Sequence, residues 1–137
     1  ADAVIGLGAS SISLFPGLIT QTEKHVGRYR MKVQNGCLGT TRGIRRSVDD
    51  QRRGAVIERL LCDGRVDLVE LGWPPAVAAQ VMADVAPKLA PMLERGLIRR
   101  HGTELIILPD GEPYARLAAA AFDTFRAAAG DRFSKAV

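Results

Sequence analysis

The stretch LIRRHGTELIIL, residues 97–108, decides the fold class of this 137-residue chain. It contains two short runs rich in aliphatic residues, 97–100 and 104–108, which are joined by His101-Gly102-Thr103. Two such runs separated by three residues that include a glycine are typical of a β-hairpin. We therefore expect a small antiparallel sheet towards the C-terminal end of the chain.

Helices are expected on both sides of this hairpin. Ser47-Val48-Asp49-Asp50 is typical of a helix start, because serine caps helices and acidic residues in the first turn favour the helix dipole. That helix is expected to end at Asp63-Gly64, with Cys62 buried on it, and a short strand is expected at 66–68. Pro74-Pro75 predicts a helix that Ala86-Pro87 interrupts, followed by a second helix to Arg95. A last helix is expected over 110–126, with four residues facing inward: Leu117, Ala121, Phe122 and Phe125.

The N-terminal third of the chain predicts a strand and a linking helix. Val4-Ile5-Gly6-Leu7 reads as a buried strand, whose partner strands we expect in a sheet outside this chain. Thr20-Gln21-Thr22-Glu23 has the capping-box pattern, so a helix is expected to start there and to stop at Asn35-Gly36. We expect three parts: 1–19, a linking helix and loop at 20–46, and a winged-helix-like domain at 47–137. The predicted fold class is mainly α with a small antiparallel β-hairpin.

Composition and charge narrow the classes of function. The net charge of +4, from 19 basic and 15 acidic residues, is compatible with an acidic ligand or nucleic acid and proves neither. The two cysteines, Cys37 and Cys62, lack the close spacing of a metal site, so we expect free thiols and no metal. No apolar run is long enough to span a bilayer, and we expect a cytoplasmic protein without a membrane partner. The chain starts at Ala1 without methionine, and we expect it to be the later part of a longer protein.

Several stretches resemble the oxygen-independent coproporphyrinogen III oxidases, radical S-adenosylmethionine enzymes of haem biosynthesis. The resemblance is to their C-terminal region, and it rests on the order and spacing of the stretches over nearly the whole chain. In sequence order they are Ile5-Gly6-Leu7-Gly8-Ala9-Ser10-Ser11-Ile12-Ser13, Thr41-Arg42-Gly43-Ile44 followed by Asp49-Asp50, Ala90-Pro91 followed by Gly96-Leu97, and Phe122-Asp123-Thr124-Phe125 followed by Phe133-Ser134.

The resemblance implies that the catalytic parts of the parent enzyme lie elsewhere. In that family a β/α barrel carries a C-x-x-x-C-x-x-C motif, which binds a [4Fe-4S] cluster with S-adenosylmethionine. This chain has no such motif, and its first strand looks like the last strand of that barrel. We therefore expect no catalytic residue and no cofactor in this chain alone, which should be inactive. Its partners would be the missing N-terminal barrel and coproporphyrinogen III.

The resemblance also implies site residues. The S-adenosylmethionine contact of the family falls on Ile12, and Gly8 and Ser10 are further candidates, since glycine lets a ligand approach the backbone. Arg42 is a candidate for the substrate's propionates, because arginine binds carboxylates bidentately. An equally good interpretation pairs Arg42 with Asp49 or Asp50. For Arg45, Arg46 and Arg52 we favour a solvated helix entrance.

A winged-helix nucleic-acid-binding module is the alternative function. The pI near 9.5 and the basic hairpin residues Arg99, Arg100 and His101 favour it. The candidate recognition helix at 88–95 argues against it, because it contains Pro91 and Glu94 and offers few side chains to read bases. We therefore consider nucleic acid an unlikely partner. Exposed apolar residues in 1–19 predict self-association through that segment.

Overall fold

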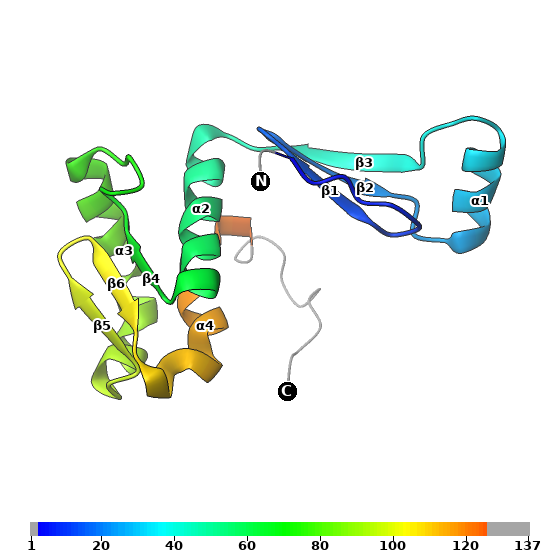
Figure 1. Cartoon of the computed structure of the whole chain (residues 1–137). Helices are drawn as coiled ribbons and strands as arrows, with labels where there is room; N and C mark the ends of the chain where they lie inside the picture. The colour runs from blue at the N-terminus through cyan, green and yellow to red at the C-terminus, as the bar shows by residue number, and fades with distance from the viewer. Residues whose placement is uncertain (1–2, 126–137) are drawn as a thin grey trace. The chain divides into compact units, whose positions relative to one another are not determined.

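The computed structural model describes residues 3–125, and the chain divides into two compact units, Ala1–Gln51 and Arg52–Val137. The described residues form two three-stranded antiparallel sheets, one in each unit, together with helices (Figure 1). The expected class, mainly α with one small hairpin, therefore understates the β content. The winged-helix description of the second unit stays a prediction.

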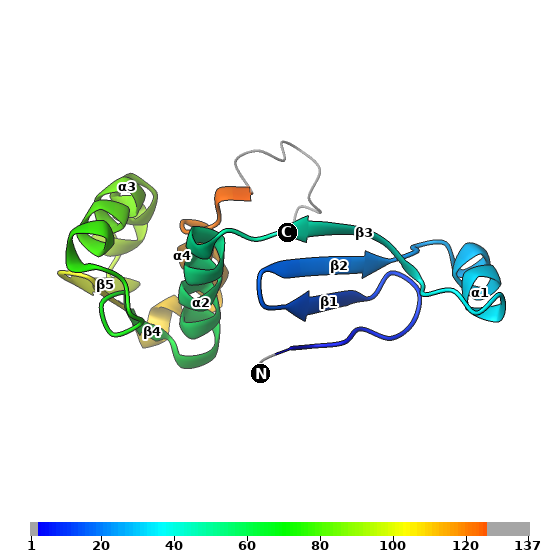
Figure 2. The ribbon, with the colours of Figure 1, turned by 90° about the horizontal axis from the view of Figure 1, so that it is seen from above.

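The first unit is built on a Pro-Gly hairpin. β1 (Ile12–Phe15) and β2 (Leu18–Thr22) are joined by Pro16-Gly17, where Gly17 has a φ of 71°. A type II turn requires such a positive φ at its third residue, and proline suits the second. β3 (Thr40–Arg45) pairs with the other side of β2, so that the sheet order is β1-β2-β3 (Figure 2).

The prediction that a helix starts at Thr20 or Thr22 is wrong for its first residues. Residues 18–22 are β2, and α1 (Val26–Gln34) begins only after His25, whose main-chain N–H donates to the Glu23 carboxylate at 3.0 Å. The loop expected in the later part of 20–46 contains β3 instead. A capping pattern reports local preference only, and here the pairing of β2 with strands on both sides overrides it.

The segment at 4–7 makes less regular structure than expected. Val4 exchanges two hydrogen bonds of 2.8 Å with Leu14, which is an isolated bridge at the edge of β1. Ile5 and Leu7 are exposed. The expected boundary after residue 19 falls within the β1-β2-β3 sheet. The role of this segment as a barrel strand stays a prediction.

The second unit has the expected hairpin. β5 (Ile98–His101) and β6 (Glu104–Ile107) pair through Gly102, and β4 (Arg65–Asp67) pairs with the other edge of β6. α2 (Val48–Asp63) begins as expected: the main-chain N–H of Asp50 donates to Ser47 Oγ at 3.1 Å. Both the hairpin and the short strand were therefore correct expectations.

α3 (Pro75–Glu94) is one continuous helix, so the break expected at Ala86-Pro87 is wrong. Pro87 lacks the N–H that would bond to the carbonyl of residue 83, which costs roughly 3 kcal/mol. Apolar residues on both sides of Pro87 are buried in the core of the second unit, and their burial offsets this cost. The buried residues of α3 are Ala78, Val81, Met82, Val85, Leu89 and Met92.

The end of the described chain partly follows the prediction. A 3-10 helix, η1 (Pro109–Tyr114), precedes α4 (Ala115–Ala120), so the long helix expected over 110–126 is wrong within the described residues. Ala121 and Phe122 are buried as expected, whereas Leu117 and Phe125 are exposed. Residue 126 lies outside the described residues.

Cys62 is exposed, contrary to the expectation that it is buried. The buried residues of α2 are Val56 and Leu60, which are four positions apart and share one face. Cys62 follows Leu60 by two positions, which is about 200° around a helix at 3.6 residues per turn. It therefore lies on the opposite, solvent-facing side.

Candidate functional site

A loop before β1 presents open backbone at Gly8. Gly8 has a φ of 97°, and a side chain added there would meet nothing within 4 Å. Its carbonyl accepts hydrogen bonds from Ser11 Oγ at 2.8 Å and from Thr22 Oγ1 at 2.7 Å. The loop is thus held from the sheet side and open on the other. A ligand can approach the backbone at Gly8 closely, because no side chain intervenes.

Ser10 is the second constrained residue of this loop. Its φ of 64° is the only positive value at a non-glycine residue among residues 3–125. The Ser10 N–H donates to the carbonyl of Glu23 at 2.9 Å. Gln21 Nε2 donates to the Ser10 carbonyl at 3.1 Å and to Ser10 Oγ at 3.3 Å. Backbone strain of this kind persists only where surrounding contacts hold it, and here Gln21 of β2 and Glu23 just after it supply them.

Strand register places Ile12 and Arg42 in one row. Ile12 pairs with Gln21, and Gln21 pairs with Arg42. Side chains of directly paired residues point to the same face of a sheet, so these three lie side by side. Arg42 donates from Nε to Gln21 Oε1 at 2.8 Å, and its Nη2 donates to the same oxygen. The two residues singled out from the resemblance are therefore separated by one side chain.

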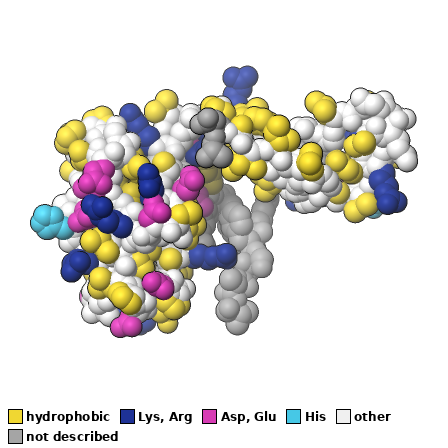
Figure 3. Space-filling view, viewed as in Figure 1, with side chains coloured by type: hydrophobic (Ala, Val, Ile, Leu, Met, Phe, Trp, Pro, Cys, Tyr) yellow, Lys and Arg dark blue, Asp and Glu magenta, His cyan; other side chains and the backbone are white. Residues whose placement is uncertain are grey.

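A second row on this face is apolar, and two of its three side chains are exposed. Leu14 pairs with Ile19, and Ile19 pairs with Ile44. Leu14 follows Ile12 by two residues on β1, so this row lies on the same side of the sheet as Ile12. The exposed fractions are 54% for Ile12, 42% for Leu14 and 55% for Ile44, which are high for large aliphatic side chains. Hydrophobic side chains are visible over the β1-β2-β3 sheet in Figure 3. A polar row and an apolar row thus share one open face.

The neighbouring arginines do not join this row. Arg46 Nη2 donates to the carbonyl of Asp50 at 2.6 Å, and Arg45 pairs with Leu18, which places it on the opposite face from Arg42. The guanidinium of Arg52 lies 5.8 Å from the ring centre of Trp73. Arg42 bonds to Gln21, and no ion pair joins it to another residue in the part of the chain that the structure describes.

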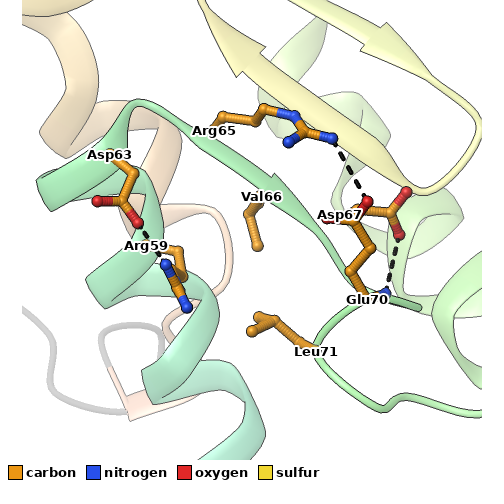
Figure 4. A pocket seen from close by; sticks show the side chains of 7 residues that line it. All are labelled: Arg59, Asp63, Arg65, Val66, Asp67, Glu70 and Leu71. Atoms are coloured by element: carbon orange, nitrogen blue, oxygen red, sulfur yellow. Dashed lines mark hydrogen bonds and ion pairs between the residues drawn. The ribbon is translucent and has the colours of Figure 1, made fainter.

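A separate hollow lies in the second unit, between the end of α2, β4 and the loop that follows it (Figure 4). Its volume is about 340 Å³, and Val66 and Leu71 are the apolar residues of its lining. The charged side chains around it are paired with one another: Arg59 with Asp63 at 2.7 Å, and Arg65 with Glu104 at 2.6 Å. The lining holds two arginines and three acidic residues, so it offers no excess of positive charge to an anionic ligand.

Asp67 in this hollow is held in its ionised form. Burial raises the pKa of its carboxyl. Hydrogen bonds from the N–H of Val69, the Thr103 hydroxyl and the N–H of Glu70, together with the nearby charge of Arg65, lower the pKa by more than burial raises it, so the net pKa is lowered. Thr103 Oγ1 donates to Asp67 Oδ1 at 3.0 Å, which joins the β5-β6 turn to the end of β4. This carboxylate therefore has a structural partner in the hairpin.

No metal-binding group is found among residues 3–125, where no three histidine, cysteine or acidic side chains come together. Cys37 and Cys62 are exposed free thiols in different units. Within the same residues, no helix combines the length and the apolar character needed to cross a membrane.

Gln21 is the functional candidate that reasoning from sequence missed. It was assigned to the start of a helix, where its side chain would have had no connection to Ile12. The signal that could have found it is Pro16-Gly17 between two short runs rich in β-branched and aromatic residues, which predicts a hairpin and therefore opposes residues 12 and 21.

Comparisons with known proteins give a consistent result. The chain is 35% identical over 127 residues to the oxygen-independent coproporphyrinogen III oxidase of Cereibacter sphaeroides, which covers 93% of this chain and 28% of that protein. It is 30% identical over 122 residues to the enzyme of the same name from Bradyrhizobium diazoefficiens. A solved structure, the coproporphyrinogen III oxidase of Escherichia coli, described as a radical SAM enzyme, matches with a TM-score of 0.77 and 26% identity over 90% of this chain. No family model matches. The chain spans a little over a quarter of the length of these relatives, 27% to 28% for the two named here.

Proposed function

This chain is related to the C-terminal region of the oxygen-independent coproporphyrinogen III oxidases, and we propose that it serves as that region in an enzyme of this activity. The proposed whole enzyme oxidatively decarboxylates coproporphyrinogen III to protoporphyrinogen IX in the cytoplasm. The observation that carries the proposal is the match in both sequence and fold over about nine tenths of the chain.

The iron–sulfur cluster of the proposed enzyme would be held by the part of the protein outside this chain. Three thiolates are needed for the family's motif, and this chain has two cysteines, which lie in different units. The residues present therefore do not fit the cluster, and no step of the reaction is assigned to them. S-adenosylmethionine bound at such a cluster supplies the radical chemistry in this class of enzymes.

The loop and the sheet face do fit S-adenosylmethionine as contact residues. Ile12 is 54% exposed at the start of β1 and can cover an apolar part of the cofactor. Gly8 offers open backbone, and Ser10 is fixed by the bonds from Gln21. We propose that these residues contact the cofactor from one side, while the rest of the enzyme binds it from the other.

Arg42 is the proposed substrate residue of this chain. Coproporphyrinogen III carries four propionates, as the family's reaction implies, and a guanidinium binds a carboxylate through two parallel hydrogen bonds. Arg42 shares its row with Ile12, so a propionate bound there would lie beside the proposed cofactor contact. In this account the chain covers the active site of the whole enzyme and helps to bind the substrate.

The exposed apolar face of the first unit is proposed to meet the remainder of the same protein. About 72% of the C. sphaeroides relative lies outside the 28% that this chain matches, so a large body is available to cover Leu14, Ile19 and Ile44. A face of this kind is costly to leave in water. Without that body, we propose that the segment at 1–19 makes the chain self-associate.

Iron reconstitution tests the proposed division of labour. We expect the full-length protein, treated anaerobically with iron and sulfide, to gain the charge-transfer absorbance of an iron–sulfur cluster. The 137-residue chain alone is expected to gain none and to show no oxidase activity. A stable cluster on the chain alone that is lost when Cys37 or Cys62 is replaced by serine would contradict the proposal.

A further inference from the structure

We propose that Gln21 is a positioning residue, which aims Arg42 at a substrate carboxylate and ties it to the loop beside the cofactor. This inference rests on the proposed function, because it takes Ile12 as the cofactor contact and Arg42 as the substrate contact. What it adds is the side chain between them and the way in which that side chain acts.

Both ends of the Gln21 amide are engaged. Its Oε1 accepts from Arg42 Nε at 2.8 Å and from Arg42 Nη2. Its Nε2 donates to the carbonyl of Ser10 at 3.1 Å and to Ser10 Oγ at 3.3 Å. A primary amide has one acceptor end and one donor end, and here each end is directed to a different neighbour. One side chain therefore connects β3 to the loop before β1.

The bonds to Gln21 leave the carboxylate-binding end of Arg42 free. A guanidinium has five N–H donors, and Gln21 uses the one on Nε and one on Nη2. The donors that remain are on Nη1 and Nη2, at the end of the group that matches the two oxygens of a carboxylate. No ion pair to Arg42 occurs among the described residues. Its charge is therefore available to a carboxylate ligand.

Fixing Arg42 beforehand strengthens binding. A free arginine side chain on an exposed strand samples many rotamers, and ordering it on binding costs conformational entropy. Gln21 is half-buried and lies in the central strand, so it is a firm support for the exposed guanidinium. Loss of the Gln21 amide should therefore weaken substrate binding even though Gln21 itself touches no substrate.

The same amide should also affect the cofactor side. Ser10 has a left-handed backbone conformation and precedes Ile12 by two residues. The bonds from Gln21 Nε2 help to hold it there. Removing them should loosen the loop and weaken S-adenosylmethionine binding, whereas removing Arg42 should leave the loop bonds in place. Effects on both ligands from one residue between them are the signature of the positioning role.

The test uses the full-length protein with four variants. Gln21→Met keeps the length and packing of the side chain but removes both hydrogen-bonding ends. It is expected to raise KM for coproporphyrinogen III roughly tenfold, with kcat changed by less than about twofold, and to raise the Kd for S-adenosylmethionine. Arg42→Ala is expected to raise KM without changing that Kd. Gln80→Met, the same change at an exposed glutamine of α3, is the control and should change neither value.

The double variant Gln21→Met with Arg42→Ala separates positioning from independent binding. If Gln21 acts on the substrate through Arg42, KM in the double variant equals that of Arg42→Ala alone, while Kd for S-adenosylmethionine equals that of Gln21→Met alone. Additive increases in KM would overturn the positioning role, as would a Gln21→Met variant with unchanged KM beside an impaired Arg42→Ala variant. Two other results would refute the proposed function itself: an unchanged KM in Arg42→Ala, or a wild-type protein that does not act on coproporphyrinogen III. Either result would also remove the substrate carboxylate as the ligand of Arg42.

Discussion

Ser47 and Asp50 cap the N-terminus of α2 reciprocally. The main-chain N–H and the hydroxyl of Ser47 both donate to Asp50 Oδ2 at 2.8 Å, and the main-chain N–H of Asp50 donates to Ser47 Oγ at 3.1 Å. Two donors at the start of the helix, which have no partner within the helix itself, are satisfied in this way. The helix that leads from the first unit into the second thus starts at a defined residue.

Removing this cap should lower stability. We expect Ser47→Ala to reduce the free energy of unfolding by about 1 kcal/mol, because the N–H of Asp50 loses its acceptor. Ser47→Thr keeps the hydroxyl and should change stability by less than half of that. Urea unfolding followed by circular dichroism measures both. Equal stability of Ser47→Ala and the unmodified chain would show that the cap contributes nothing.

The core of the second unit should be more sensitive than the surface of the same helix. Leu89 is fully buried in α3, whereas Val77 is 43% exposed on it. Leu89→Ala is expected to cost about 2–5 kcal/mol through lost burial and the cavity that it leaves. Val77→Ala should cost about 0.5 kcal/mol or less. The comparison of the two unfolding midpoints checks the packing, and a Val77→Ala variant as unstable as Leu89→Ala would refute it.

The Asp67–Thr103 contact should make stability depend on pH. The pKa of Asp67 is lowered in the folded state, so the unfolded chain binds its proton more readily. The contribution of Asp67 is therefore present above the unfolded pKa, near 3.9, and is lost as the pH falls through the folded pKa. Thr103→Val removes one donor, so it should raise the pKa of Asp67 and reduce the acid-sensitive part of the stability, whereas Thr103→Ser should preserve it. A carboxyl NMR titration that gives the same Asp67 pKa in all three proteins would disprove this.

Ile12 should matter to the cofactor and not to the fold. In the full-length protein, Ile12→Asp is expected to weaken S-adenosylmethionine binding, because it places a charge where an apolar contact is proposed. Leu117→Asp is the matched control: Leu117 is 57% exposed and Ile12 is 54% exposed, but Leu117 lies on α4 in the other unit. Isothermal titration with S-adenosylmethionine gives both affinities. Wild-type affinity in Ile12→Asp would remove Ile12 from the site.

The hairpin of the second unit and the start of α2 were easier to predict from sequence than the β1-β2-β3 sheet. The hairpin at 97–108 and the start of α2 follow from local signals, namely a glycine-containing turn and a capping serine, and both were found. The β1-β2-β3 sheet was missed, because the pairing of β2 with β3 joins residues about twenty positions apart, across the inserted α1. Thr20-Gln21-Thr22-Glu23 has a good local helix signal, and the non-local strand pairing overrides it.

The candidate site was predictable only in part for the same reason. Ile12 and Arg42 were selected from a resemblance, and each could be named without knowing where the other lies. Their common row, and the Gln21 amide between them, depend on the register of three strands. The helix break predicted at Pro87 was wrong for a different reason. A proline removes one hydrogen bond, but the buried residues on both sides of it keep α3 continuous.

Anaerobic turnover of coproporphyrinogen III by the full-length protein tests the central claim most directly. With S-adenosylmethionine and a reductant, we expect protoporphyrinogen IX to form, and we expect Arg42→Ala to need a higher concentration of coproporphyrinogen III for the same rate. The Leu117→Asp variant should turn over at the wild-type rate. Reconstituted full-length protein that binds a cluster and S-adenosylmethionine but leaves coproporphyrinogen III unchanged would contradict the account.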